Sequence, residues 1–254
     1  GMYGSSSRGG RGLGSMIPGW EEHSGKFAVL GRMLANLRAE TKDRIVIISN
    51  YTQTLDLIGQ MCSERRYPYV RLDGSTTIGK RQKLVKQFND PSTDSFVFLL
   101  SSKAGGCGIN LIGGNRLVLF DPDWNPANDK QAAARCWRDG QKKKCYLYRF
   151  LSAGTIEEKI FQRQLSKESL QNVVNGSGEL EQSILTKEEL RRLFSLDCTT
   201  YSDTHDTCGC TRCPKCVEGD LGRDADPEYK TWEEQIDEAD EQKLDEWAHH
   251  HRMD

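Results

Sequence analysis

One glutamine and two arginines lie at the spacing of a single helical face. Gln131, Arg135 and Arg138 occupy positions i, i+4 and i+7, which point the same way on an α-helix. A guanidinium offers a planar fork of donors that fits phosphate oxygens, and an arginine that reaches a transferring γ-phosphate stabilises the charge there. The spacing predicts a polyphosphate clamp. Taken alone, the pattern favours a solvated helix face, and its neighbours change that balance.

Strands and helices alternate on both sides of this segment. Short apolar and β-branched runs predict strands at residues 44–49, 69–72, 96–101, 116–120 and 145–151. Apolar residues at helical spacing predict helices at residues 26–37, 52–65, 80–88 and from Thr155 onward. The alternation predicts an α/β fold with a RecA-like, doubly wound, mostly parallel sheet, and ligands of such sheets bind beyond the carboxyl ends of the strands.

Four loops that follow the predicted strands carry small polar residues and glycines. They are residues 49–52, 73–77, 101–110 and 121–126. Hydroxyls, a lysine and glycine amides bind phosphate oxygens without reading base sequence. Each loop alone is ordinary turn chemistry, but four of them at one sheet edge beside the two arginines predict a site for a polyanion.

Charge is unevenly distributed along the chain. Residues 218–254 hold 14 acidic and 4 basic residues, a net charge of −10, whereas residues 1–217 hold 23 acidic and 31 basic residues, a net charge of +8. A basic body suits binding to a polyanion. No apolar run approaches the ~20 residues of a membrane span, so no membrane partner is expected.

A second constellation lies near the carboxyl end, and it consists of cysteines and a histidine. The candidate metal ligands are His205, Cys208, Cys210, Cys213 and Cys216. Zinc in a structural site takes four thiolate or imidazole donors in a tetrahedron. The alternative is a run of free thiols, which is a reactivity liability when exposed. The cluster therefore predicts a structural zinc site.

Five segments resemble motifs of the superfamily 2 ATPases of the SWI/SNF type. Residues 44–54 and 69–76 resemble motifs IV and IVa, and residues 101–111, 121–126 and 131–141 resemble motifs V, Va and VI. The match runs in the family's order over residues 24–169. Within the family, residues 49–56 and 151–163 are most similar to the double-stranded-DNA translocases of homologous recombination.

The resemblance implies the second RecA-like lobe of a motor, in which ATP lies between two lobes and duplex DNA crosses both. The chain has no Gly-x4-Gly-Lys-[Ser/Thr] loop to hold phosphates. ATP with magnesium is therefore expected mainly on an amino-terminal lobe, and the isolated chain is expected to lack appreciable ATPase activity. The implied partners are double-stranded DNA, a RecA-like recombinase filament and that amino-terminal lobe, in the nucleus.

Two other functions stay open at this point. One is the lobe of a nucleosome-remodelling ATPase of the same superfamily. The other is a zinc-stabilised module that binds DNA or protein and has no motor role.

The resemblance also implies roles for single residues. Arg138 is the expected arginine finger, Arg135 lies beside it at the phosphates, and Gln131 and Gly108 contact the nucleotide. The residues expected to follow one DNA strand along its backbone are Ser49, Asn50, Ser75, Ser101 and Lys103. The expected zinc ligands are His205, Cys210, Cys213 and, in preference to Cys208 or Cys198, Cys216.

The expected organisation has four parts. They are a disordered linker or tag remnant at residues 1–24, the RecA-like lobe at 25–170, a helical extension with the zinc site at 171–217, and an acidic tail at 218–254. A capping box at residues 186–189 predicts a further helix that buries Leu190, Leu193 and Phe194. Trp137, between the two arginines, is expected to pack their helix onto the sheet.

Overall fold

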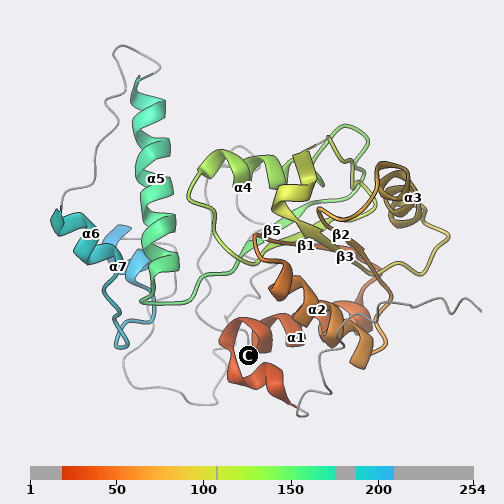
Figure 1. The fold of residues 1–254 in the computed structure, drawn as a ribbon, viewed down its shortest axis with the longest axis horizontal. Coiled ribbons are helices and arrows are strands. Elements are labelled where there is room, and N and C mark those ends of the chain that lie inside the picture. The colour runs from red at the N-terminus through yellow and green to blue at the C-terminus, as the bar shows by residue number, and fades with distance from the viewer. Residues whose placement is uncertain (1–18, 107, 175–186, 209–254) are drawn as a thin grey trace, which may run out of the picture.

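The computed structural model describes residues 19–106, 108–174 and 187–208 (Figure 1). Within these ranges five strands form one sheet: β1 (Ile45–Ser49), β2 (Tyr69–Leu72), β3 (Val97–Ser101), β4 (Arg116–Leu119) and β5 (Tyr146–Arg149). All neighbouring pairs are parallel, in the order β2-β3-β1-β4-β5. The predicted parallel α/β sheet is confirmed.

Helices cover both faces of this sheet, as the alternation predicted (Figure 1). The helices α1 (Gly25–Glu40) and α2 (Thr52–Glu64) lie on one face, and α3 (Ile78–Asn89) and α4 (Pro126–Ala133) lie on the other. The helices α5 (Ile156–Val174), α6 (Lys187–Leu193) and α7 (Asp203–Cys208) lie together to one side of the sheet, and the short 3-10 helices are η1 (Trp20–His23) and η2 (Ser102–Gly106). None of these helices combines the length and the apolar character needed to cross a bilayer, as far as the described residues go.

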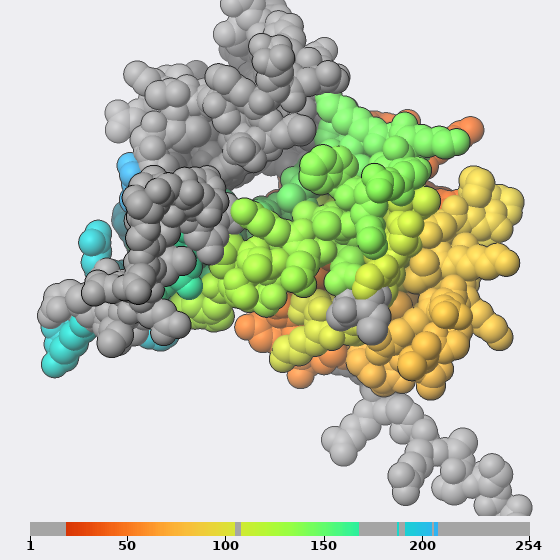
Figure 2. Space-filling view, turned by 90° about the horizontal axis from the view of Figure 1, so that it is seen from above, coloured from red at the N-terminus to blue at the C-terminus, as the bar shows by residue number. Residues whose placement is uncertain are grey.

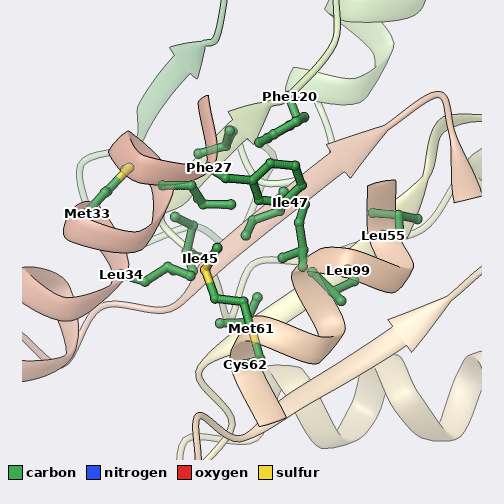
Figure 3. Close-up of a cluster of buried hydrophobic side chains, with 14 of the residues drawn as sticks. Phe27, Met33, Leu34, Ile45, Ile47, Leu55, Met61, Cys62, Leu99 and Phe120 are labelled. Carbon is green, nitrogen blue, oxygen red and sulfur yellow. The ribbon is translucent and has the colours of Figure 1, made fainter. Parts of the chain in front are cut away.

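The central strand β1 is buried on both faces, and its side chains divide between two cores. Ile45 and Ile47 point toward α1 and α2, where Phe27 and Met61 lie in the same cluster (Figure 3). The alternate residues of β1 face α3 and pack with Phe88 on the other side. A strand without a solvated face reads as one continuous apolar run, which is why the sequence pattern located it. Because hydrophobic clusters pack against both faces of β1, the position of its carboxyl end is well fixed.

The folded lobe begins earlier than expected. Trp20 is only 8% exposed, its Nε1 donates a hydrogen bond to Glu64 at 3.3 Å, and its ring lies 5.1 Å from that of Phe27. Beside it, Arg65 forms an ion pair with Glu21 at 2.8 Å. The expected linker boundary at residue 24 therefore falls too late, because η1 packs against α1 and α2.

One buried carboxylate joins α5 to α7. Glu158 is 3% exposed, and its Oε2 accepts from the backbone N of Gly154 at 2.6 Å and of Asp203 at 3.0 Å. Its Oε1 accepts from Ser202 Oγ at 2.9 Å and from the backbone N of Thr204 at 3.2 Å. A carboxylate at a helix N-terminus satisfies donors that have no partner inside the helix, so α7 is anchored by a side chain from a distant part of the chain.

The predicted burial along α6 is confirmed at one position and wrong at another. Leu193 is 7% exposed, whereas Phe194 is 74% exposed. The helix ends at Leu193, so Phe194 no longer follows the helical face that the spacing assumed. Thr186 and the side chain of Leu190 lie outside the described residues.

Replacing Gly154 by alanine is expected to destabilise the protein by ~2 kcal/mol or more. Gly154 has a φ of +65°, where an L side chain is strained, and an added Cβ would lie 1.8 Å from the carbonyl oxygen of Asp197. The control is Gly79→Ala in α3, where a Cβ meets nothing within 4 Å and helix propensity favours alanine by up to ~1 kcal/mol. Urea unfolding of the two variants measures both effects, and equal stabilities would contradict the expectation.

Candidate functional site

The four polar loops meet at one edge, where β2, β3, β1 and β4 end. Ser49 and Ser101, the last residues of β1 and β3, are direct register partners. Parallel strands bring their carboxyl ends together, so the loops at residues 49–52, 73–77 and 121–126 flank the loop that follows β3. This placement at a single edge confirms what the order of the elements predicted.

Asp121 ties the loop after β1 to the loop after β4. Its carboxylate accepts a hydrogen bond from Ser49 Oγ and another from the backbone N of Asn50 at 3.2 Å. Asn50 also donates from Nδ2 to the carbonyl oxygen of Pro122 at 3.4 Å. Burial raises the pKa of Asp121, and the hydrogen bond from Ser49 lowers it. Ser49 is 1% exposed, so its hydroxyl is not at the surface, and it holds the two loops together through Asp121.

The loops after β2 and β3 present the exposed groups. Ser75 is exposed and donates to Asp73 Oδ1 from its backbone N at 3.0 Å and from its Oγ at 2.5 Å. Lys103, in η2, is also exposed, whereas Ser101 is buried. Arg81 of α3 links the two loops, because its guanidinium donates to the carbonyl oxygens of Thr76 and Ala104 at 2.9 and 3.0 Å.

The two arginines do not lie on one helix, and the predicted i, i+4, i+7 face is wrong. The helix α4 ends at Ala133, so it contains Gln131 but neither Arg135 nor Arg138. The backbone N of Leu111 donates to the carbonyl oxygen of Arg135 at 2.9 Å. The helical ladder is lost just before this point, where the backbone N of Arg135 donates to the carbonyl oxygen of Ala132 at 3.1 Å. In a continuing helix the Arg135 carbonyl would accept from the amide four residues later, and the tertiary bond from Leu111 occupies it instead. Residues 134–141 are called the arginine turn below.

The arginine turn is held against the loop that follows β3. Gln141 Nε2 lies within hydrogen-bonding distance of the carbonyl oxygens of Ile112 at 3.2 Å, Gly114 at 2.9 Å and Cys136 at 3.2 Å. Its backbone N donates to the carbonyl oxygen of Arg138 at 3.0 Å. Buried carbonyls need partners, and one glutamine supplies them here. Its side chain was not predicted to have a role, since its partners are backbone atoms with no sequence signature.

Arg138 and Gly108, both expected on the nucleotide side, are in contact. Arg138 Nη1 donates to the carbonyl oxygen of Gly108 at 3.1 Å, and both residues are exposed. Gly108 has a φ of +31°, a conformation that glycine adopts at little cost. Arg135 is half-buried in the same turn, and Gln131 is exposed on α4. The structure therefore brings Arg138 and Gly108 together and places Arg135 in the same turn, while Gln131 lies on the preceding helix.

Trp137 does not pack onto the sheet, and that expectation is wrong. It is 68% exposed, while the neighbouring Cys136 is 2% exposed and takes the inward position. Burial raises the pKa of the Cys136 thiol to about 12, so the sulfur stays protonated and behaves as a small apolar side chain. Because Cys136 fills the space under the turn, the indole lies at the surface between the two arginines.

The predicted metal ligands fall mostly beyond what the structure describes. His205 lies in α7, and Cys210, Cys213 and Cys216 lie outside the described residues. Within the described ranges no group of three or more histidine, cysteine, aspartate and glutamate side chains is placed to hold a metal ion.

Replacing Ser49 by alanine is expected to raise the pKa of Asp121 further, because the variant loses a hydrogen bond to the ionised carboxylate. An acid whose pKa is raised in the folded state loses stability as pH rises through that pKa, so the variant is expected to lose more stability toward neutral pH. Titration of the carboxyl carbon by NMR measures the shift. In the control Ser92→Ala, the pKa of Asp90 is expected to rise instead, and an unchanged Asp121 titration in Ser49→Ala would contradict the assignment.

Comparison with known proteins finds the same family. The helicase conserved C-terminal domain matches residues 25–140. The chain is 66% identical over 199 residues to the DNA repair and recombination protein RAD54 of Oryza sativa subsp. japonica, which covers 77% of this chain and 20% of that protein. It is 64% identical over 204 residues to Protein CHROMATIN REMODELING 25 of Arabidopsis thaliana, with 79% of this chain and 22% of that protein covered.

An insect relative and a solved structure show the same relationship. The chain is 59% identical over 197 residues to the RAD54-like DNA repair and recombination protein of Drosophila mojavensis, with 78% of this chain and 25% of that protein covered. It superposes on the crystal structure of the C-terminal part of the Fun30 ATPase domain with a TM-score of 0.57 and 31% identity, over 70% of this chain and 54% of that one.

The chain therefore spans about a fifth to a quarter of the length of these curated relatives. Its five-stranded parallel sheet carries the motif loops at one edge, and its similarity to the relatives extends over most of its own length. The chain therefore resembles the second RecA-like lobe of the SWI/SNF-type superfamily 2 ATPases in its fold and in its sequence, and residues 25–140 carry the helicase conserved C-terminal domain.

Proposed function

We propose that the chain is the second motor lobe of an ATP-dependent double-stranded-DNA translocase that assists recombinase-driven strand exchange in homologous recombination repair. The observation that carries the proposal is the exposed guanidinium of Arg138, on a turn fixed to the polar edge of an open sheet. Relatives named as DNA repair and recombination proteins support it. Nuclear localisation and a recombinase filament as partner belong to the same proposal.

The proposed part of this lobe in catalysis is electrostatic. Arg138 supplies a fixed positive charge to the γ-phosphate of ATP held mainly by the first lobe, and Arg135 supplies a second. Magnesium, bound with the nucleotide, neutralises phosphate charge. The hydrogen bond to Gly108 uses one nitrogen of the Arg138 guanidinium and orients the group. The other N–H groups are then available to phosphate oxygens. Gln131 and Gly108 border the nucleotide.

The proposed DNA contact uses the same edge and the neighbouring helix α3. Asn50, Ser75 and Lys103 present polar groups at least partly exposed, while Ser49 and Ser101 are buried and act by shaping the loops. The helix α3 carries four basic residues and no acidic residue. Figure 2 shows α3, in orange to yellow, on the same face as the green segment that contains α4. Phosphate contacts without base contacts make movement independent of sequence.

A second candidate is the lobe of a nucleosome-remodelling ATPase. One observation favours it: a relative is named Protein CHROMATIN REMODELING 25. ATPase stimulation by naked duplex DNA, with no further stimulation by nucleosomes, distinguishes the translocase from the remodeller. A zinc-stabilised binding module without a motor role would show no stimulation by either.

The isolated chain is expected to hydrolyse no ATP, and the protein that includes the first lobe is expected to hydrolyse it in response to duplex DNA. In that two-lobe protein, Arg138→Ala is expected to lower kcat about 10³-fold or more, because an arginine finger contributes about three to five decades. Its matched control is Arg191→Ala on α6, an exposed arginine remote from the edge, with an unchanged rate. Steady-state ATPase measurement with duplex DNA decides between these outcomes.

The DNA contact is tested in the same protein with Lys103→Ala. Loss of one phosphate contact is expected to reduce the slope of log affinity against log salt by about one. Arg138→Ala is expected to leave that slope unchanged. An isolated chain with ATPase activity that Arg138→Ala abolishes would contradict the two-lobe proposal.

We also propose a structural zinc ion bound by His205, Cys210, Cys213 and Cys216. The support is the ligand spacing in the sequence and the anchoring of α7, which contains His205, by Glu158. Elemental analysis of the purified chain is expected to find one zinc ion per molecule, and Cys213→Ser is expected to lose it together with thermal stability. Cys198→Ser, outside the proposed set, serves as the control. A metal-free chain of equal stability would refute the site.

A further inference from the structure

The helix α5 carries a polar side chain that is almost completely buried. Gln164 is 2% exposed, and its Nε2 donates to the carbonyl oxygen of Asp123 and to Asp129 Oδ2, the latter at 2.9 Å. Its Oε1 is also buried and has no hydrogen-bond partner among the described residues. A half-satisfied buried amide costs free energy, so an interface that served only packing would be more stable with apolar residues in place of both Gln164 and Asp129.

Both partners of Gln164 belong to the segment that leads into the arginine turn. Asp123 lies in the loop after β4, and its Oδ1 accepts from the backbone N of Asn125 at 2.8 Å. Asn125 is the N-cap of α4, and its side chain accepts from the backbone N of Ala127 at 3.1 Å. Asp129 lies in the first turn of α4, two residues before Gln131. One amide therefore holds both the loop that starts α4 and the helix itself.

The helix α4 buries little apolar surface of its own. All eight of its residues are described, and Asp129, which is 5% exposed, is the one buried residue among them. Its apolar contact to the core is the partly buried Ala132. A helix normally gains its stability by burying an apolar face, and α4 buries a carboxylate instead. Gln164 near its beginning therefore contributes a polar contact that holds the helix in place.

The electrostatics explain why the residue at position 164 is an amide. Burial raises the pKa of Asp129, while the hydrogen bond from Gln164 and the positive charge of Arg149 lower it. An amide donates to the carboxylate and to a carbonyl oxygen without adding charge. A leucine would leave Asp129 without this donor, and a glutamate would place a second carboxylate against it.

We infer that Gln164 is a positioning residue for the arginine turn. It touches no nucleotide, and it acts through Asp123 and Asp129 on the helix that precedes Arg135 and Arg138. Gln164 thereby links the segment that contains the arginine turn to α5, and Glu158 of the same helix contacts α7. This inference rests on the proposed ATPase function, and it adds a residue that the motif resemblance does not assign.

The test compares two identical substitutions on α5 in the two-lobe protein. Gln164→Leu is expected to lower DNA-stimulated kcat about tenfold with KM for ATP changed less than twofold, because misplaced arginines lose contacts made in the transition state. The control is Gln162→Leu, whose side chain donates to Asp203 at 2.7 Å rather than to α4. Its kcat is expected to stay within twofold of the wild type.

Two further measurements separate positioning from general loss of stability. In an Arg138→Ala background, Gln164→Leu is expected to lower kcat less than twofold further, since residues that act as a unit are not additive. In the isolated chain, hydrogen exchange of residues 123–138 is expected to be faster in Gln164→Leu and unchanged in Gln162→Leu. If Gln164→Leu does not fold, Gln164→Asn, which is shorter by one methylene, replaces it with the same expectations.

Three outcomes would overturn the inference: an unchanged kcat in Gln164→Leu, an equal loss in Gln162→Leu, or a full additional loss in the Arg138→Ala background. Failure of the proposed function has a different signature. There, Arg138→Ala would leave kcat unchanged, while the hydrogen exchange of residues 123–138 would still report whether Gln164 holds α4.

Discussion

The hydrogen bond from Leu111 N to the carbonyl oxygen of Arg135 holds the arginine turn against the loop that follows β3. The helix α4 ends at Ala133, and because this loop amide takes an acceptor that a longer helix would use, it fixes the turn that follows. The turn brings Arg135 and Arg138 to the loop that contains Gly108, instead of spreading them along a helix. Irregular segments carry function when a rigid scaffold holds them, and the scaffold here is the doubly buried centre of the sheet.

The strands and the edge on which the loops gather could be predicted from the sequence, and the reason is physical. A parallel strand such as β1 is buried along its whole length, so its residues must be apolar and the run is visible in the sequence. Once the strands are parallel, their following loops share an edge. The arginine turn could not be predicted in the same way, since helical spacing reports local periodicity and the bond that holds the turn comes from Leu111, 24 residues earlier in the sequence.

Aromatic residues and glutamines were the hardest to place, because their roles depend on partners. Trp20 was expected to lie in a linker, but it is buried, because its indole N–H donates to Glu64 and its ring packs against that of Phe27. Trp137 looked like core, and it is exposed because the smaller Cys136 takes the inward position. Gln141 lies at the end of the segment that resembles motif VI, but nothing in the sequence indicated the partners of its side chain, since most of them are backbone carbonyls. The sequence gives the type of each side chain, but it does not show which atoms that side chain contacts in the folded protein.

The Glu158 cap has a consequence for how the chain tolerates changes in length. The carboxylate contacts the start of α7 directly, so a tertiary contact fixes α7 to α5. Loop-closure entropy grows slowly, by only about 0.6 kcal/mol for each doubling of loop length. Insertions after Val174 are therefore expected to leave the contact between Glu158 and α7 in place.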